Sequence, residues 1–94
     1  MTPIKVRILD TKSLIFEGEV DRISSTNEVG PFDIYPTHAN FISIIKKSLV
    51  LYNRGKKIKE INFAQAILKV KQDNVGIYLG LEELILEEKP TINT

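Results

Sequence analysis

Apolar residues recur at every second position near the start of the chain, where Ile4, Val6 and Ile8 alternate with Lys5 and Arg7. This period is typical of a β-strand that buries one face. Short apolar runs rich in valine, isoleucine and tyrosine follow at 14–16, 41–45, 49–52, 58–63, 66–71 and 75–79. The pattern therefore predicts an all-β fold, a small β-sandwich of about eight to ten short strands.

Polar or glycine-containing breaks separate these runs. They predict turns or loops at 10–13, 27–31, 46–48, 53–56 and 72–74. The uneven spacing of Val20 and Ile23 predicts a β-bulge just after Gly18. The whole chain, 1–94, is expected to form one domain with its core at about 4–80, and 81–94 a short helical turn or a frayed tail.

The segment 30–39 holds two of the four prolines, Pro31 and Pro36, and the only histidine, His38. Each proline fixes its own φ and pushes the preceding residue into an extended conformation. We therefore expect a stiff corner here, leading into the apolar run at 41–45. Such a corner either presents side chains to a partner or turns the chain between sheets.

Composition and charge narrow the possible functions. Ninety-four residues suffice for one domain, and a net charge of +1 gives no field that would attract nucleic acid. The absence of cysteine excludes disulfides and thiolate metal sites. No apolar run approaches the roughly 20 residues that span a bilayer, so no direct membrane insertion is expected.

Catalytic chemistry finds little support in the residues. A catalytic triad requires a nucleophile and a carboxylate around the imidazole, and no nucleophile motif frames Thr37 and Asp33 beside His38. The glycines do not form a phosphate-binding loop, and the basic cluster at 54–59 is best explained as a solvated hairpin tip. No catalytic residue, cofactor or metal site is predicted.

Several segments form an ordered series that resembles a known family. The series contains F-E-G-E-V at 16–20, a loop ending at Gly30, I-Y-P-T-H-A at 34–39, A-I-L-K-V at 66–70 and D-N-V at 73–75. In order and spacing it is similar to the N-terminal β-sandwich domain of the epsilon subunit of F-type ATP synthases, over residues 4–79. The most specific part is the corner, where the family motif reads I-x-P-G-H-A.

The chain departs from the family pattern at Thr37 and Asp33, where glycines are common, and at 64–66 and Lys69. Glycine often serves positions with positive φ, which threonine tolerates poorly, so the corner is expected to differ in backbone detail. The sequence also stops where the family continues into two helices. It is therefore expected to resemble the short members of the family, without a helical brake and without bound nucleotide.

The resemblance implies a non-catalytic role at the foot of the central stalk, between the gamma subunit and the membrane rotor ring, coupling ion translocation to ATP synthesis. The gamma subunit would meet the corner residues Thr37, His38, Ala39, Asn40, Phe41 and Ile42. The rotor ring would meet the loop residues Thr26, Asn27, Glu28, Val29, Gly30, Pro31 and Phe32. Glu28 is the one carboxylate of this loop and is expected to pair with arginines of the ring.

The implied location is peripheral, on the cytoplasmic, matrix or stromal side of an energy-coupling membrane. Two other classes of function stay open from the residues alone. One is a free-standing β-sandwich adaptor, since fold does not fix function. The other is a small hydrolase built around His38, which requires a nucleophile and a substrate pocket beside the imidazole.

Overall fold

The computed structural model describes residues 3–37 and 39–80, and its regular elements there are all strands. They are β1 (Ile4–Leu9), β2 (Leu14–Val20), β3 (Arg22–Thr26), β4 (Pro31–Ile34), β5 (Phe41–Asn53), β6 (Lys56–Lys71) and β7 (Asn74–Leu79). The all-β prediction is confirmed. The prediction of a helical turn or frayed tail at 81–94 lies outside the described residues.

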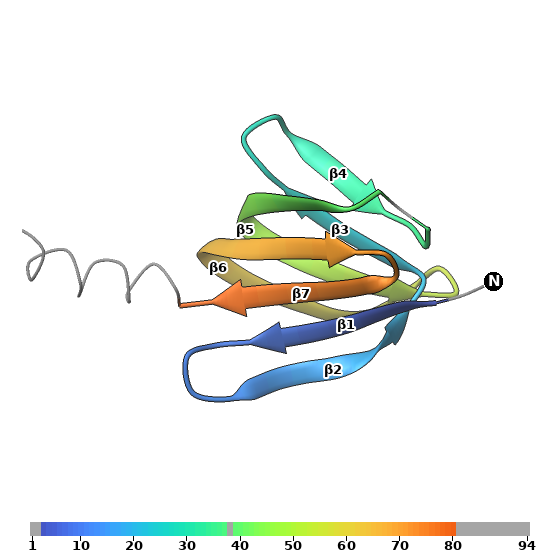
Figure 1. Cartoon of the computed structure of the whole chain (residues 1–94), viewed down its shortest axis with the longest axis horizontal. Coiled ribbons are helices and arrows are strands. Elements are labelled where there is room, and N and C mark those ends of the chain that lie inside the picture. Colours follow the sequence, from blue (N-terminus) through green and yellow to red (C-terminus); the bar gives the residue numbers. More distant parts are fainter. Residues whose placement is uncertain (1–2, 38, 81–94) are drawn as a thin grey trace, which may run out of the picture.

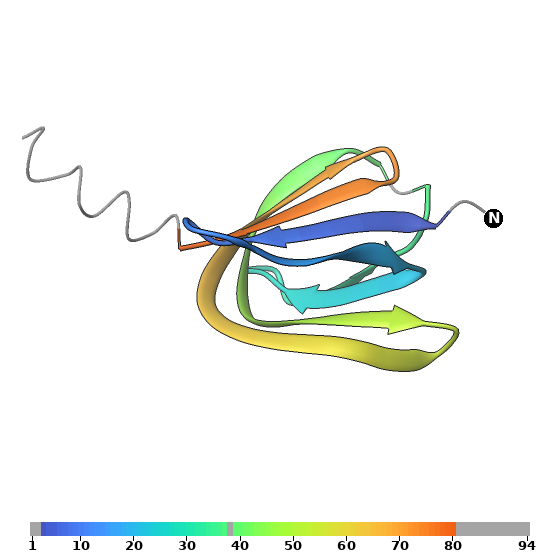
Figure 2. The same cartoon turned by 90° about the horizontal axis from the view of Figure 1, so that it is seen from below.

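The strands form one sheet in the order β2-β1-β7-β6-β5-β3-β4, and this sheet folds over on itself into two layers (Figures 1 and 2). Both layers share β5 and β6, which are long and bend together at one side of Figure 2. The first layer contains β2, β1, β7 and the adjoining parts of β6 and β5. The second contains β4, β3 and the remaining parts of β5 and β6.

The bend explains why the described part has seven strands rather than the eight to ten expected. The turn predicted at 46–48 is wrong, because Lys46 and Lys47 lie inside the continuous strand β5. The register with β6 shifts at this point, and Ala64 is the extra residue on β6. Such a bulge bends a strand without ending its pairing, and polar side chains at an outer bend stay solvated.

The bulge predicted after Gly18 is also wrong. The chain leaves the first layer at Val20 and enters the second at Arg22, with Asp21 between the two strands. Val20 and Ile23 are both buried because they point into the interior from opposite layers. A change of layer therefore produces the uneven spacing that was attributed to an extra residue.

The space between the layers is filled by aliphatic side chains. The largest fully buried side chains are Ile4, Val6, Ile8, Val20, Ile23, Ile34, Ile45, Leu49, Leu51, Leu68 and Ile77. At one side Phe32 of β4 meets Phe41 of β5 edge-to-face, with 6.3 Å between ring centroids. The close packing makes the domain stiff, because protein interiors have low compressibility.

Candidate interaction surfaces

The β3–β4 turn is a tight hairpin tip that is closed by its own residues. Asn27 and Gly30 exchange two backbone hydrogen bonds, both 3.1 Å. The Asn27 side chain adds an acceptor, since its Oδ1 accepts hydrogen bonds from the N–H groups of Val29 (2.9 Å) and Gly30 (3.3 Å). Gly30 has φ = 139°, a conformation that favours glycine.

The tip presents Glu28 and Val29 to solvent. Val29 is 97% exposed, so its side chain lies open to contact at the tip. Glu28 lies 3.8 Å from the Lys46 ammonium in a largely exposed ion pair. The Asn27 amide donates to Ser43 Oγ at 3.2 Å, so the tip is also braced against β5.

Of the remaining residues predicted to meet the ring, Pro31 is also exposed, and the others are partly buried. Thr26 and Pro31 lie in the strands that flank the tip. Phe32 is half-buried and packs against the core. The exposed part of the predicted loop therefore consists of Glu28 and Val29 with the flanking Pro31.

The corner follows β4 at its other end, so the tip and the corner lie at opposite ends of this strand (Figure 1). Thr37 has φ = 66°, in the left-handed region that glycine adopts readily and threonine rarely. Its N–H donates to Asp73 Oδ1 at 3.0 Å, and Asn40 Oδ1 accepts from the Gln72 N–H at 2.6 Å. Two bonds to the β6–β7 turn thus hold the corner.

The predicted gamma-facing residues differ in exposure. Thr37, Ala39, Asn40 and Ile42 are exposed, and Ile42 is 68% accessible. Phe41 is half-buried because it packs on the core beside Phe32. His38 lies outside the described residues. The corner therefore offers Ile42, rather than Phe41, as its exposed apolar contact.

Beside the corner lies a cluster of aromatic and basic side chains that was not predicted from the sequence. The Arg22 guanidinium stacks on Tyr52, 3.8 Å from the ring centroid, and a hydrogen bond with Tyr35 raises the pKa of Arg22. Arg22 and Tyr52 meet because they are paired across β3 and β5. Their positions in the chain give no signal of this pairing.

The described residues contain no group of three histidine, cysteine, aspartate or glutamate side chains that could hold a metal ion. Across this same part of the chain, no helix is long and apolar enough to cross a membrane.

The basic cluster predicted at a hairpin tip lies on the β5–β6 hairpin, where Lys57 pairs with Glu60 at 2.8 Å. The geometry thus defines a stiff β-sandwich domain that presents side chains on braced turns at its ends.

Comparison with known proteins identifies the family of this domain. Residues 3–79 match the model of the ATP synthase delta/epsilon chain β-sandwich domain. The chain belongs to this family, which the I-Y-P-T-H-A corner indicated, and whose members are subunits of a larger enzyme complex.

Curated relatives agree with this assignment. The ATP synthase epsilon chain of Leptospira borgpetersenii serovar Hardjo-bovis is 26% identical over 74 residues, which cover 79% of this chain and 58% of the relative. The epsilon chain of Geobacter metallireducens is 26% identical over 80 residues, covering 85% and 58%. The chain therefore spans less than two thirds of the length of these relatives.

Solved structures share the fold at low sequence identity. A chain of the central stalk and c-ring of the Tetrahymena thermophila mitochondrial ATP synthase superposes with a TM-score of 0.69 at 8% identity, covering 82% of this chain and 63% of that one. A chain in the OSCP/F1/c-ring structure of the Euglena gracilis mitochondrial ATP synthase gives 0.73 at 15% identity, covering 94% and 62%.

Proposed function

We propose that this chain is a non-catalytic rotor subunit of an F-type ATP synthase, which links the gamma subunit to the membrane rotor ring. In this role it helps to couple ion translocation to ATP synthesis. Family membership supports the proposal. The observation that carries it is the placement of two braced, solvent-exposed turns at opposite ends of the four-residue strand β4.

The proposed role requires a rigid spacer between two partners. At about 3.3 Å per residue, β4 separates the tip from the corner by roughly 13 Å. Each turn is tied to another strand or turn by side-chain hydrogen bonds, through Asn27 at the tip and through Asp73 and Asn40 at the corner. A load applied at one turn is therefore passed to the packed core rather than absorbed by a loose loop.

We assign the tip to the rotor ring. Glu28 supplies a carboxylate for a ring arginine, and Val29 supplies an apolar contact beside it. An exposed ion pair of this kind contributes about 1 kcal/mol or less, so it sets orientation more than affinity. Before the ring is bound, the Glu28 carboxylate lies 3.8 Å from the Lys46 ammonium, and this exposed pair holds it only weakly.

We assign the corner, Thr37 to Ile42, to the gamma subunit. Ile42 is its exposed apolar anchor, and His38 is proposed to contribute beside it. The assignment places the protein peripherally, on the cytoplasmic, matrix or stromal side of an energy-coupling membrane. We propose neither a nucleotide nor a nucleic acid as a ligand of this chain.

The test is an affinity pull-down of the tagged chain from detergent-solubilised membranes of its source, followed by mass spectrometry. Recovery of gamma, the catalytic-head subunits and the ring is the expected result. Recovery of other soluble partners without the catalytic head would contradict it and would favour a free-standing adaptor.

Two variants test the assignment of the two ends. Ile42→Asp is expected to weaken gamma binding by about 2 kcal/mol, as for a truncated interface anchor, and to leave ring contact unchanged once gamma is bound. Glu28→Lys is expected to reduce cross-linking to the ring without reducing gamma affinity. Lys56→Glu, at the exposed tip of the β5–β6 hairpin, is the control for a charge reversal of equal size and opposite sign away from both turns.

A further inference from the structure

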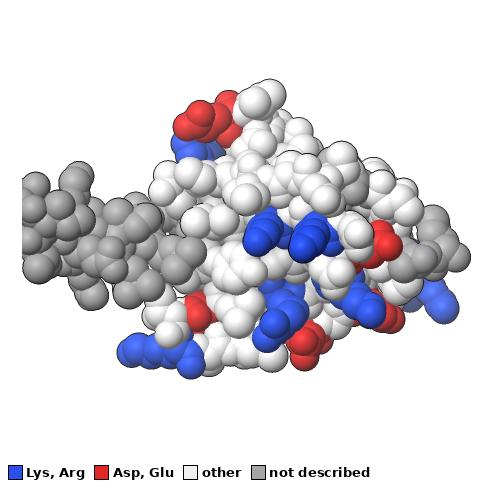
Figure 3. All heavy atoms as spheres, viewed as in Figure 1, with Lys and Arg blue, Asp and Glu red and all other residues white. Residues whose placement is uncertain are grey.

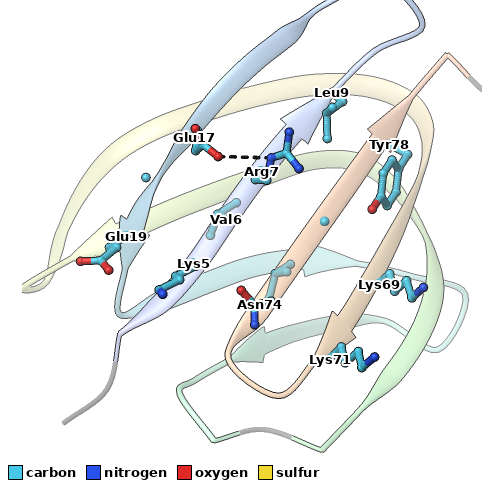
Figure 4. A pocket seen from close by; sticks show the side chains of 13 residues that line it. Lys5, Val6, Arg7, Leu9, Glu17, Glu19, Lys69, Lys71, Asn74 and Tyr78 are labelled. Carbon is cyan, nitrogen blue, oxygen red and sulfur yellow. Dashed lines mark ion pairs between the residues drawn. The ribbon is translucent and has the colours of Figure 1, made fainter.

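The two arginines on the described strands differ in what they pair with. Arg7, on the first layer, forms an ion pair with Glu17 at 3.2 Å (Figure 4). Figure 3, which looks onto this layer, shows acidic groups beside its lysines and arginines. Arg22, at the start of β3 on the second layer, is partly buried and forms no ion pair with any described residue. Because an anion stabilises a guanidinium that is partly withdrawn from water, the free position beside Arg22 points to a ligand.

Arg22 is held in one orientation by aromatic side chains. Its neighbour Ile23 and the Leu51 opposite are fully buried, so Arg22 and its cross-strand partner Tyr52 point outward from the second layer. The guanidinium stacks on Tyr52 at 3.8 Å from the ring centroid, and Tyr35 hydrogen-bonds with it. Its Nε atom is buried and has no hydrogen-bond partner among the described residues. A planar fork held in this way keeps unused donors and has little rotamer freedom left to lose on binding.

Two neighbouring carboxylates are already bonded to other donors. Asp21 Oδ2 accepts a hydrogen bond from the Arg54 N–H at 2.8 Å. Asp33 Oδ1 accepts one from Ser24 Oγ at 2.5 Å. Neither carboxylate lies within ion-pair distance of Arg22. The guanidinium can therefore still donate to an anion from outside the chain.

Arg22 lines an open hollow of about 350 Å³, which is also bordered by Asp21, Tyr35, Pro36, Tyr52 and Gly55. Tyr35 is 53% exposed, and no atom lies within 4 Å of the place that a Cβ on Gly55 would take. Arginine and tyrosine are the residues that most often anchor protein interfaces. A small inorganic anion would reach the cation and leave the tyrosines and Pro36 uncovered, whereas a peptide segment can cover both.

We propose that this hollow binds the glutamate or aspartate side chain of an acidic protein segment. The carboxylate accepts hydrogen bonds from the Arg22 guanidinium, and the flanking residues of the segment pack on the two tyrosines and Pro36. Arg54 and Lys56 are exposed on either side of the hairpin glycine and favour an acidic segment through longer-range attraction. The hollow lies on the second layer, and the inference is independent of the surfaces assigned to gamma and to the ring.

The test is an NMR titration of the isotope-labelled chain with a terminally blocked tripeptide, acetyl-Leu-Glu-Leu-amide. The reporters are the side-chain Nε–H signal of Arg22, whose burial slows exchange with water, and the backbone N–H signal of Gly55. The control ligand is acetyl-Leu-Gln-Leu-amide, which has nearly the same shape and no charge. Inorganic phosphate is the probe for a site that accepts any small anion.

The glutamate peptide is expected to shift both signals saturably, with a Kd on the order of 1 mM for one anchored side chain. The glutamine peptide is expected to bind more than about tenfold more weakly, because it cannot accept charge-assisted hydrogen bonds. Equal binding of the two peptides, or tighter binding of phosphate than of the glutamate peptide, would overturn the inference. Absence of a saturable shift would overturn it as well and would leave the proposed function standing.

Two variants, followed through the Gly55 signal, separate the guanidinium from positive charge in general. Arg22→Lys keeps the charge but loses the planar fork, and it is expected to weaken binding of the glutamate peptide by about fivefold or more. Lys56→Gln removes a charge from the adjacent hairpin and is expected to change the affinity by less than about twofold. Equal losses would assign the binding to diffuse attraction and overturn the inference. Thermal unfolding checks both variants, and the comparison of the two peptides on the unaltered chain decides the question even where a variant fails to fold.

Discussion

The two turns that flank β4 are held in different ways. The tip at 27–30 is closed within four residues, by the backbone exchange between Asn27 and Gly30 and by the Asn27 side chain. The corner after β4 is closed from a distance, by Asp73 and Gln72 of the β6–β7 turn. The first contains a glycine at its positive φ, whereas the second places Thr37 there.

The difference shows where stability must come from in each turn. The tip follows from local sequence, so it can form before the rest of the sandwich packs. The corner depends on bonds across 36 and 32 positions of the chain, and these must offset the left-handed conformation of a β-branched residue. Substitutions at the two turns should therefore differ in sign as well as in size.

The largest effect is expected at the tip. Asn27→Ala removes the acceptor for two backbone N–H groups and the donor to Ser43. We expect a loss of about 1–2 kcal/mol in the free energy of unfolding, measured by urea denaturation. Asn27→Asp keeps the acceptor and should lose less. A loss in Asn27→Asp equal to that in Asn27→Ala would mean that the Ser43 bond, not local closure, holds the tip.

A smaller loss is expected at the corner when its distant acceptor is removed. Asp73→Ala leaves the exposed Thr37 N–H to solvent, and we expect a loss of about 1 kcal/mol. Asp73→Asn retains an acceptor oxygen and should recover most of it. If both variants unfold at the same urea concentration, the bond to Thr37 is not what stabilises the corner.

The opposite sign is expected at Thr37 itself. The left-handed conformation costs a residue with a Cβ about 1–2 kcal/mol, and glycine loses about 0.5–1 kcal/mol in chain entropy. Thr37→Gly should therefore raise the free energy of unfolding by about 0.5 kcal/mol. Thr37→Ala, which keeps a Cβ, is the matched control and should gain less. A destabilised glycine variant would show that the threonine carries no backbone strain.

Much of this fold follows from local pattern. The alternation of Ile4, Val6 and Ile8 identifies a half-buried strand, and Gly55 marks the β5–β6 hairpin. The prediction failed where the chain changes layer. Lys46 to Ser48 have the composition of a turn, but two paired strands bend together there, and only their mutual pairing keeps them extended.

The candidate surfaces also divide into parts that local sequence predicts and parts that depend on strand pairing. The exposed pair Glu28 and Val29 lies where a loop was predicted, since loop composition is a local property. The hollow at Arg22 needs the register of three strands to bring Arg22 beside Tyr52 and Tyr35. These residues lie far apart in the chain, and the pairing of β3 with β5, which are not consecutive strands, gives no turn signal between them.

A third turn, between β1 and β2, is expected to show the smallest effect on stability, and it can be compared directly with the tip. Asp10 closes the β1–β2 turn as Asn27 closes the tip, since its Oδ1 accepts from the N–H groups of Lys12 (2.8 Å) and Ser13 (2.7 Å). These two bonds lower the pKa of Asp10. A local closure of the same shape is thus made pH-sensitive by a carboxylate at one turn and pH-insensitive by an amide at the other.

The sign follows from the lowered pKa. The stabilisation is fully present above the ordinary aspartate pKa of about 3.9 and is lost as the pH falls through the lower folded-state pKa. Asp10→Asn keeps one acceptor oxygen without the titration. Urea denaturation between about pH 7 and pH 2 should show a shallower acid loss of stability for Asp10→Asn than for the unaltered chain. The effect of Asn27→Ala should stay constant over the same range, because an amide does not titrate. Parallel pH curves for Asp10→Asn and the unaltered chain would mean that the Asp10 carboxylate contributes nothing to the turn beyond its shape.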